Sequence, residues 1–251
     1  MQRIFLLGGH DLEMATIRQL LDDNGENYID HNLSWSNADV NAYYDDMLAR
    51  QHSSQFYGIE LRGNAPGGVG YVLIDHHNEN SGKVSSIEQV AEVLGLKLSR
   101  YQQLVAANDA GYIGAMLAMG ATRQEVEDIR LRDRQMQGVT AAEEEVAEKE
   151  LADVQVCNGI KVVKTSLCHF SPLVDRLYPY GQLLVYSNSE LTYYGSDSRT
   201  LVENYVRLVE EGIAYYGGTN CSFFGIGAGH CSPHQIGQYV DQIIGLVGVS
   251  R

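Results

Sequence analysis

One stretch of the sequence places three side chains suited to metal chemistry directly after an apolar segment. Residues 71–74 read Tyr-Val-Leu-Ile, and Asp75, His76 and His77 follow at once. A short apolar run bounded by glycines and polar residues predicts a buried strand that ends at Asp75. Ligands bind at that end of the strands in parallel α/β sheets, and carboxylate and imidazole groups suit Mn²⁺, Zn²⁺ or Fe²⁺. We therefore expect these three side chains to form a catalytic metal site. In the alternative interpretation, the Asp caps a turn and both histidines are surface residues.

A second set of polar side chains follows the first predicted strand. Residues 3–7 predict that strand, a Gly8-Gly9 turn comes next, and residues 14–21 have helical spacing. The polar residues in between are His10, Asp11 and Glu13. They would project from the loop or the first helical turn as further ligands, unless the two acidic residues only complement the positive end of the helix dipole.

The chain around the Asp75 segment is predicted to alternate between strands and helices. Strands are expected at residues 27–29 and 56–61, with a helix over residues 38–51 between them. Glu60 stands near the end of the second of these strands and is a further candidate ligand.

Helical signals continue after the Asp75 segment. Ser85 and Glu88 have the spacing of a capping box and predict a helix over residues 87–94. A further helix from Ser99 leads to Asp109, which is either a ligand or the cap of the next segment.

The second half of the chain has a different character. Residues 122–153 are rich in Glu, Arg and Ala with helical spacing, whereas residues 154–165 and 182–194 are β-rich. We therefore expect a catalytic domain over residues 1–121, a helical linker over 122–154 and a smaller α/β domain over 155–251. Gly227 and Gly229, next to His230, form a loop whose backbone amides could approach an anion.

Composition limits the classes of function. The net charge is −14, from 32 acidic and 18 basic residues, which argues against binding along nucleic acid but not against a small anionic substrate. The four cysteines show no C-x-x-C pair, so neither a zinc site nor a disulfide framework is predicted. We expect a cytoplasmic protein without membrane contact, because no apolar segment has the length of a signal peptide or a membrane span.

The Asp75-His76-His77 stretch resembles the signature of the DHH phosphoesterase superfamily, and matching features occur before and after it. The family's first motif corresponds to His10-Asp11-Leu12-Glu13, although the family commonly has Asp-x-Asp with the His three residues earlier. Glu60 stands where the family carries a bridging Asp, and Asp109 precedes Gly111 and Tyr112 as in the family's fourth motif. The resemblance implies that His77 faces the substrate phosphate. It also implies these metal ligands: His10, Asp11, Glu13, Glu60, Asp75, His76 and Asp109.

The C-terminal part resembles the substrate-binding domain that many DHH proteins carry. Residues 196–199, Ser-Asp-Ser-Arg, are similar to a Ser-x-Arg-Ser segment, and the glycine loop before His230 is similar to the family's glycine-rich loop. The resemblance implies a parallel-sheet α/β domain and a smaller α/β domain across a cleft. It also implies that Arg199, Gly227, Gly229 and His230 bind a second phosphate or a terminal nucleotide, together with His77.

The function that this resemblance implies is metal-dependent hydrolysis of a small phosphorylated substrate. Candidates are a short oligonucleotide, a cyclic dinucleotide and a nucleotide phosphate. One or two Mn²⁺ ions are expected, with Mg²⁺, Zn²⁺ or Fe²⁺ as alternatives, and a homodimer is left open. Two other functions remain: a manganese pyrophosphatase, and a degenerate DHH domain that serves as a nucleotide sensor or assembly partner.

Overall fold

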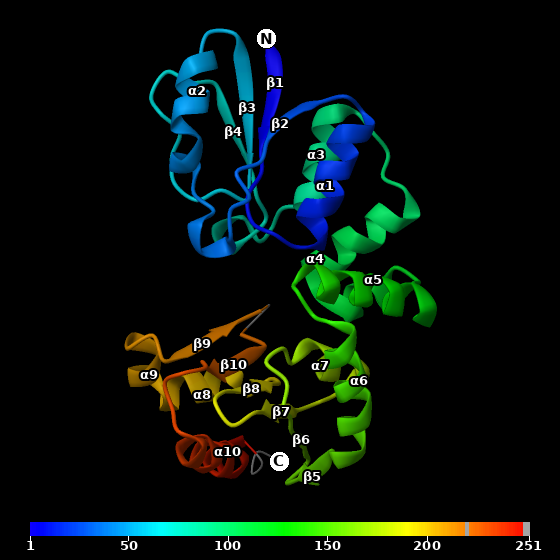
Figure 1. Cartoon of the computed structure of the whole chain (residues 1–251), viewed down its shortest axis with the longest axis vertical. Coiled ribbons are helices and arrows are strands. Elements are labelled where there is room, and N and C mark those ends of the chain that lie inside the picture. Colours follow the sequence, from blue (N-terminus) through cyan, green and yellow to red (C-terminus); the bar gives the residue numbers. More distant parts are fainter. Residues whose placement is uncertain (219–220, 248–251) are drawn as a thin grey trace. The chain divides into compact units, whose positions relative to one another are not determined.

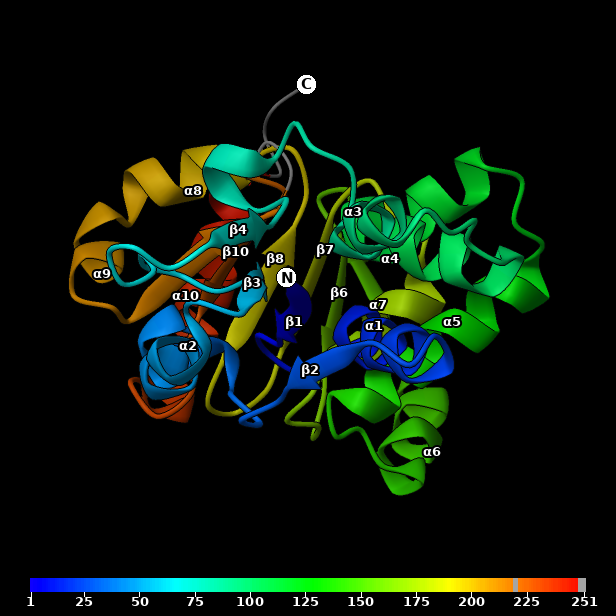
Figure 2. The same ribbon diagram turned by 90° about the horizontal axis from the view of Figure 1, so that it is seen from above.

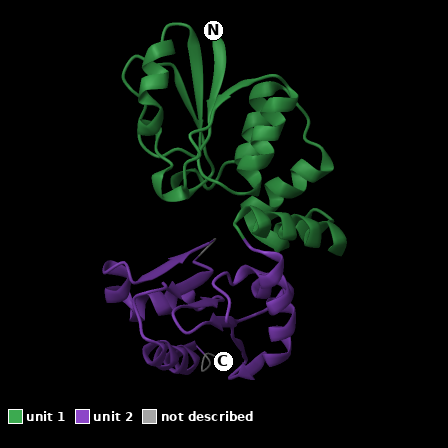
Figure 3. Ribbon diagram, viewed as in Figure 1, with its two compact units in different colours: residues 1–138 green, residues 139–251 purple. Residues whose placement is uncertain are grey.

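The chain is divided into two compact units. The computed structural model describes residues 1–218 and 221–247. Residues 1–138 form unit 1 and residues 139–251 belong to unit 2 (Figure 3).

Unit 1 is built on a four-stranded parallel sheet with the order β2-β1-β3-β4 (Figure 1). Leu6 pairs with Ile29 on one side and with Gly58 on the other, and Ile59 pairs with Ile74. This register brings the carboxyl ends of all four strands to one edge. The strands, which confirm the predicted ones to within two residues, are β1 (Gln2–Leu6), β2 (Asn27–Ile29), β3 (Ser54–Ile59) and β4 (Tyr71–Ile74).

Helices cover both faces of this sheet. Successive side chains of a strand point to opposite faces. Phe5 accordingly packs with the residues of α1 (Leu12–Asp23) and α3 (Ser86–Leu94), whereas Ile4 packs with those of α2 (Tyr44–Arg50). Figure 2 shows α1 and α3 on one side of the strands and α2 on the other. The helix expected over residues 38–51 begins instead with the 3₁₀ turn η2 (Val40–Tyr43), at which Asp39 accepts a hydrogen bond from the Asn41 amide.

The predicted capping box of Ser85 with Glu88 is present and begins α3. A second capping box, Thr122 with Glu125, begins α5 (Arg123–Met136). Between them, α4 (Arg100–Ala118) is interrupted at Gly111 and Tyr112, where the Tyr112 φ of 58° is not helical. Asp109 therefore lies just before a kink and not in a continuous helix.

The segment expected as a helical linker is divided between the units. Helix α5 packs on α4 and α1 and belongs to unit 1, whereas α6 (Ala141–Glu150) packs on α7 (Ser171–Leu177) in unit 2. The boundary follows Gly138, whose φ is 92°. A glycine in this left-handed conformation ends α5 without strain.

Unit 2 is built on a mixed six-stranded sheet with the order β5-β6-β7-β8-β10-β9. Of the described strand pairs, β6 with β7 is parallel and the others are antiparallel. Helices α6 and α7 pack on one face and α8 and α10 on the other. The strands are β5 (Gln155–Cys157), β6 (Ile160–Lys164), β7 (Leu183–Tyr186), β8 (Leu191–Tyr194), β9 (Ala214–Gly217) and β10 (Phe223–Ile226); the remaining helices are α8 (Ser198–Asn204), α9 (Val206–Glu210) and α10 (Pro233–Val247).

All four cysteines are free thiols. Among the described residues, no helix has both the length and the apolar character needed to cross a bilayer.

Candidate metal centre

Four side chains of unit 1 converge at the carboxyl edge of its sheet. Each of Glu60, His76, His77 and Asp109 offers a ligand atom, and these atoms lie within 4.8 Å of one another. The shortest distance joins His76 Nε2 and Asp109 Oδ2 at 2.5 Å, and Glu60 Oε1 lies 3.5 Å from the same nitrogen. We call these four residues the metal-site group. All four are predicted site residues, three of them metal ligands and His77 a phosphate contact.

The group comes from three separate elements. Glu60 follows β3, His76 and His77 follow β4, and Asp109 precedes the kink of α4. Glu60 has a φ of 54°, in the left-handed region that costs a residue with a Cβ some backbone energy. Its amide nevertheless continues the ladder to the Ile74 carbonyl at 2.8 Å. The sheet thus holds the strained residue in place at the site.

Buried atoms without partners indicate that this group suits a cation. His76 Nε2, Asp109 Oδ2 and Glu13 Oε2 are buried; the first two meet as an ion pair without regular hydrogen-bond geometry, and Glu13 Oε2 has no hydrogen-bond partner within the described ranges. The Glu13 oxygen lies only 3.7 Å from the His76 nitrogen. Buried polar atoms left without partners are costly, and a divalent ion among them would satisfy all three. Oxygen and imidazole donors of this kind fit Mn²⁺, Zn²⁺ or Fe²⁺.

The N-terminus of α3 holds the two buried glutamates. Ser86 Oγ donates to Glu60 Oε1 at 2.7 Å, and the Ile87 amide donates to Glu13 Oε1 at 3.0 Å. Carboxylates are favoured at this positive end of a helix. The sequence indicates the capping box of α3 but not these two contacts, because nothing in the local pattern shows which distant carboxylate a helix terminus will meet.

Asp75 borders the group on the side of His77. Its Oδ1 accepts from the His77 amide at 3.0 Å and lies 3.1 Å from His77 Nδ1, while Oδ2 accepts from Asn80 Nδ2 at 2.8 Å. Burial works to raise the pKa of Asp75, but these donors outweigh it and lower the pKa below its ordinary value. Asp75 is thus a carboxylate that orients His77.

The carboxylates around His76 change its charge state. Burial works to lower the pKa of His76, but Asp109 and Glu60 outweigh it and raise the pKa to about 10. Burial and the nearby Glu60 carboxylate raise the pKa of Asp11 to about 7. Burial together with Asp109 raises the pKa of Glu13 well above its ordinary value. Without a cation, protons therefore occupy this site.

The three polar residues of the first motif differ in their relation to the metal-site group. Asp11 is the N-cap of α1 and accepts from the Met14 amide at 2.8 Å. This contact agrees with the alternative interpretation, in which the acidic residue serves the N-terminus of the helix. Glu13 lies beside the metal-site group, as described above. His10 is exposed in the preceding loop and is not among the four converging residues.

A buried polar network that was not predicted from the sequence lies next to Asp109. Arg130 Nη1 donates to Asn108 Oδ1 at 2.9 Å and to Asp133 Oδ2 at 2.6 Å. The Arg130 guanidinium also lies over the Tyr112 ring, 4.4 Å from its centroid. These contacts fix both sides of the α4 kink. In the sequence, this network is visible only as an Arg and an Asp three residues apart on the apolar side of a helix. Many exposed ion pairs have the same spacing, so the pattern does not identify a buried one.

The two side chains of unit 2 that are expected to bind substrate, Arg199 and His230, belong to opposite ends of the β8-β10 strand pair. Arg199 is exposed on α8, which follows β8, and His230 is exposed in the loop after β10. Because Tyr194 pairs with Phe223 and Leu191 with Ile226, the end of β8 meets the start of β10. Roughly 10 Å of strand therefore separates the two segments. The role of both residues in substrate binding stays a prediction.

The glycines of the expected loop lie with His230. Gly229 has a φ of 83° in the turn after β10. A Cβ added to Gly227 would lie 3.7 Å from His230 Cδ2. At the same end as Arg199 lie instead Gly195, which follows β8, and Gly217 and Gly218, because Gly217 pairs with Phe223. The glycine loop and Arg199 therefore belong to opposite ends of the β8-β10 pair.

Comparisons with known proteins found similarity in structure but not in sequence. No protein-family model and no curated protein matches the chain. The DHH domain of a member of a family of ribosomal proteins matches with a TM-score of 0.51 at 12% identity, over 98% of this chain and 87% of that one. A pGpG-specific phosphodiesterase, PggH, from Vibrio cholerae matches with a TM-score of 0.48 at 12% identity, over 97% of each chain. An uncharacterized protein from Helicobacter pylori has a TM-score of 0.32 at 11% identity, over the whole of both chains.

The match to the DHH domain agrees with the architecture. A parallel four-stranded sheet carries Asp75, His76 and His77 at its carboxyl edge, and a second unit with a mixed six-stranded sheet follows. The fold class expected from the sequence is therefore confirmed. The chain has the α/β fold of the DHH-domain proteins.

Proposed function

We propose that this protein is a divalent-metal-dependent phosphoesterase that hydrolyses a small phosphorylated substrate, such as a short oligonucleotide, a cyclic dinucleotide or a nucleotide phosphate. The observation that carries the proposal is the metal-site group, Glu60, His76, His77 and Asp109, at the carboxyl edge of a DHH-type sheet. We propose Mn²⁺ as the ion, held by Glu60, His76 and Asp109, with Glu13 beside them. A bound divalent ion would activate water and neutralise charge on phosphoryl oxygens.

His77 is the side chain best suited to contact the substrate. It is 46% exposed, whereas the His76 side chain is 8% exposed. Its Nδ1 faces Asp75, which leaves Nε2 available to a phosphate oxygen. A protonated imidazole donates charge-assisted hydrogen bonds to phosphate. Asp75 acts through His77 as a positioning residue, since a carboxylate next to Nδ1 fixes the ring orientation.

The test is release of p-nitrophenol from bis-p-nitrophenyl phosphate with and without Mn²⁺. We expect turnover that requires the metal and falls to background in His76→Ala. His52→Ala is the matched control, because His52 is exposed, and it should keep the wild-type rate. Turnover that survives in His76→Ala would come from a contaminant or another site and would contradict the proposal.

Two further assays separate the alternatives. Rapid hydrolysis of pyrophosphate together with inactivity on every phosphodiester would indicate a pyrophosphatase. Nucleotide binding measured by calorimetry, without hydrolysis of any substrate in the presence of Mn²⁺, would indicate a binding protein and would reject the enzymatic proposal.

A further inference from the structure

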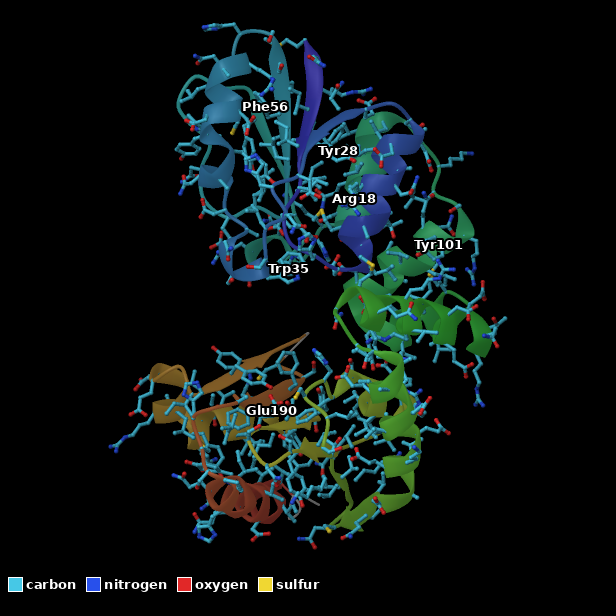
Figure 4. All side chains as sticks on the ribbon, viewed as in Figure 1. Arg18, Tyr28, Trp35, Phe56, Tyr101 and Glu190 are labelled. Carbon is cyan, nitrogen blue, oxygen red and sulfur yellow. The ribbon has the colours of Figure 1, made fainter. Side chains whose placement is uncertain are left out.

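Trp35 is an exposed aromatic residue beside the metal-site group. It is the only tryptophan of the chain, and 43% of its surface is exposed in η1 (Trp35–Asn37), the 3₁₀ turn that follows β2. Its ring centroid lies 6.3 Å from that of His77, with the rings at 61°. Figure 4 places Trp35 at the carboxyl edge of the sheet of unit 1, well apart from Tyr101 on α4. A single exposed apolar residue is ordinary, so its setting has to decide whether it has a role.

The indole is held against the backbone of the loop that carries the first motif. One face packs on Gly9 so closely that a Cβ at this position would lie 2.3 Å from Trp35 Cδ2. Only glycine leaves room for the ring there. The loop between β1 and α1 therefore includes both the surface under the indole and Asp11, and it leads directly into the first turn of α1, which carries Glu13.

The backbone around Trp35 is also anchored to the segment after β3 that supplies Glu60. Arg62 donates from Nη2 to the Ser36 carbonyl at 2.6 Å and from Nε to the Ala38 carbonyl at 3.3 Å. Ser34 Oγ and Ser36 Oγ each donate to Asn37 Oδ1 at 2.7 Å. An aromatic ring that is ordered before binding loses little conformational entropy when a ligand stacks on it.

We propose that Trp35 stacks on a nucleobase of the substrate whose phosphate is bound at the metal-site group. This inference rests on the proposed function and narrows its substrate class to nucleotides. A nucleotide carries a planar ring and a phosphate on one sugar, and unit 1 offers an ordered indole next to a phosphate-binding histidine. Stacking tolerates different bases because every base has a π-face. Trp35 thus favours substrates that carry a base over substrates without one, and it discriminates little among the different bases.

Fluorescence tests the stacking without turnover. Because Trp35 is the only tryptophan, emission excited at the red edge of its absorption reports this residue alone. We expect saturable quenching by GMP and none by ribose 5-phosphate, which has the same phosphate but no base. Protein unfolded in urea serves as the control for collisional quenching. Equal responses to the two ligands, or no saturable response to GMP, would overturn the inference.

Kinetics provide the second test, with two esters that share a leaving group. Thymidine 5′-(p-nitrophenyl phosphate) carries a base, and methyl p-nitrophenyl phosphate does not. We expect Trp35→Ala to lower the ratio of their kcat/KM values about tenfold, and Trp35→Phe to restore part of it. Tyr101→Ala removes another exposed ring and should leave the ratio unchanged.

The outcomes distinguish this inference from the proposed function. If Trp35→Ala cleaves both esters with an unchanged ratio, the stacking inference is wrong and the phosphoesterase proposal stands. If the wild type cleaves neither ester nor any other phosphoester with Mn²⁺, the proposed function is wrong, and the GMP titration alone decides whether Trp35 binds a base.

Discussion

His76 and Asp109 form the closest contact in the candidate site, an ion pair of 2.5 Å between buried atoms. Glu13 Oε2 lies 3.7 Å from the same His76 nitrogen and has no hydrogen-bond partner in the described part of the chain. A buried polar atom left without a partner is costly, and a divalent cation among these side chains would satisfy it.

Asp109→Asn should weaken Mn²⁺ binding by about a hundredfold or more, because it replaces an anionic donor by a neutral amide. Isothermal titration calorimetry measures the change, and circular dichroism should show an unchanged fold. Asp128→Asn is the matched control, since Asp128 is exposed on α5. Equal Mn²⁺ affinity in both variants would exclude Asp109 as a ligand.

Metal binding should release protons. In the metal-free protein the pKa of His76 is about 10 and that of Glu13 is well above its ordinary value, so His76 is protonated at pH 7 and must lose its proton to bind a metal. Affinity should therefore rise with pH between 6 and 8, by about tenfold per pH unit for each proton released. Calorimetry in two buffers with different ionisation enthalpies counts these protons. A binding enthalpy that is independent of the buffer would contradict this prediction.

Helix α4 contributes through its kink and not through regular helical geometry. The interruption at Gly111 and Tyr112 lies next to Asp109, and Arg130 of α5 contacts residues on both sides of it. The neighbouring helix therefore supports the conformation that the site needs.

Arg130→Met should reduce the free energy of unfolding by roughly 3–5 kcal/mol, because it leaves the buried Asp133 carboxylate without its guanidinium partner. Urea denaturation measures the loss. The double variant Arg130→Met, Asp133→Leu should recover much of it, since both charges of this pair are then removed. Arg100→Met breaks the exposed pair with Glu125 and should change stability little. A loss in Arg130→Met no larger than in Arg100→Met would show that the network does not stabilise unit 1.

The sequence predicts the elements of unit 1 better than their contacts. Apolar runs and capping boxes identify β1, β3, β4 and α3 because those signals are local. The kink at Tyr112 depends on Arg130, which lies in the next helix, and no local pattern encodes it. The position of Trp35 depends in the same way on Gly9 and Arg62, so the exposed aromatic part of the site was not predicted.

Every candidate metal ligand described above belongs to unit 1 (residues 1–138), and unit 2 has cores of its own. Arg199 of unit 2 is exposed, and it has no ion pair with the part of the chain that the structure describes.

Residues 1–138 expressed alone should bind Mn²⁺ and melt at a higher temperature when the ion is present. A ligand at 100 times its dissociation constant stabilises the folded state by about 2.7 kcal/mol. Differential scanning fluorimetry measures the shift. Residues 139–251 are the matched control and should show none. If only the full chain responds to Mn²⁺, unit 1 does not hold a complete site.

Arg199→Ala should lower kcat/KM for a dinucleotide substrate more than for bis-p-nitrophenyl phosphate, because a guanidinium binds phosphate through paired, charge-assisted hydrogen bonds. The relevant quantity is the ratio of the two values. Arg207→Ala changes another arginine of unit 2, on α9, and should leave the ratio as it is. An Arg199→Ala ratio equal to that of the wild type would remove this residue from the substrate site.

The break after Gly138 has a consequence for how such a protein can evolve. Recombination at this glycine would exchange residues 139–251 for another sequence without altering any candidate metal donor of unit 1. If unit 1 is the catalytic unit of the proposed phosphoesterase, its chemistry would stay constant while selection acted on the new C-terminal residues. Gene fusion could then give a descendant a new substrate while it kept its activity.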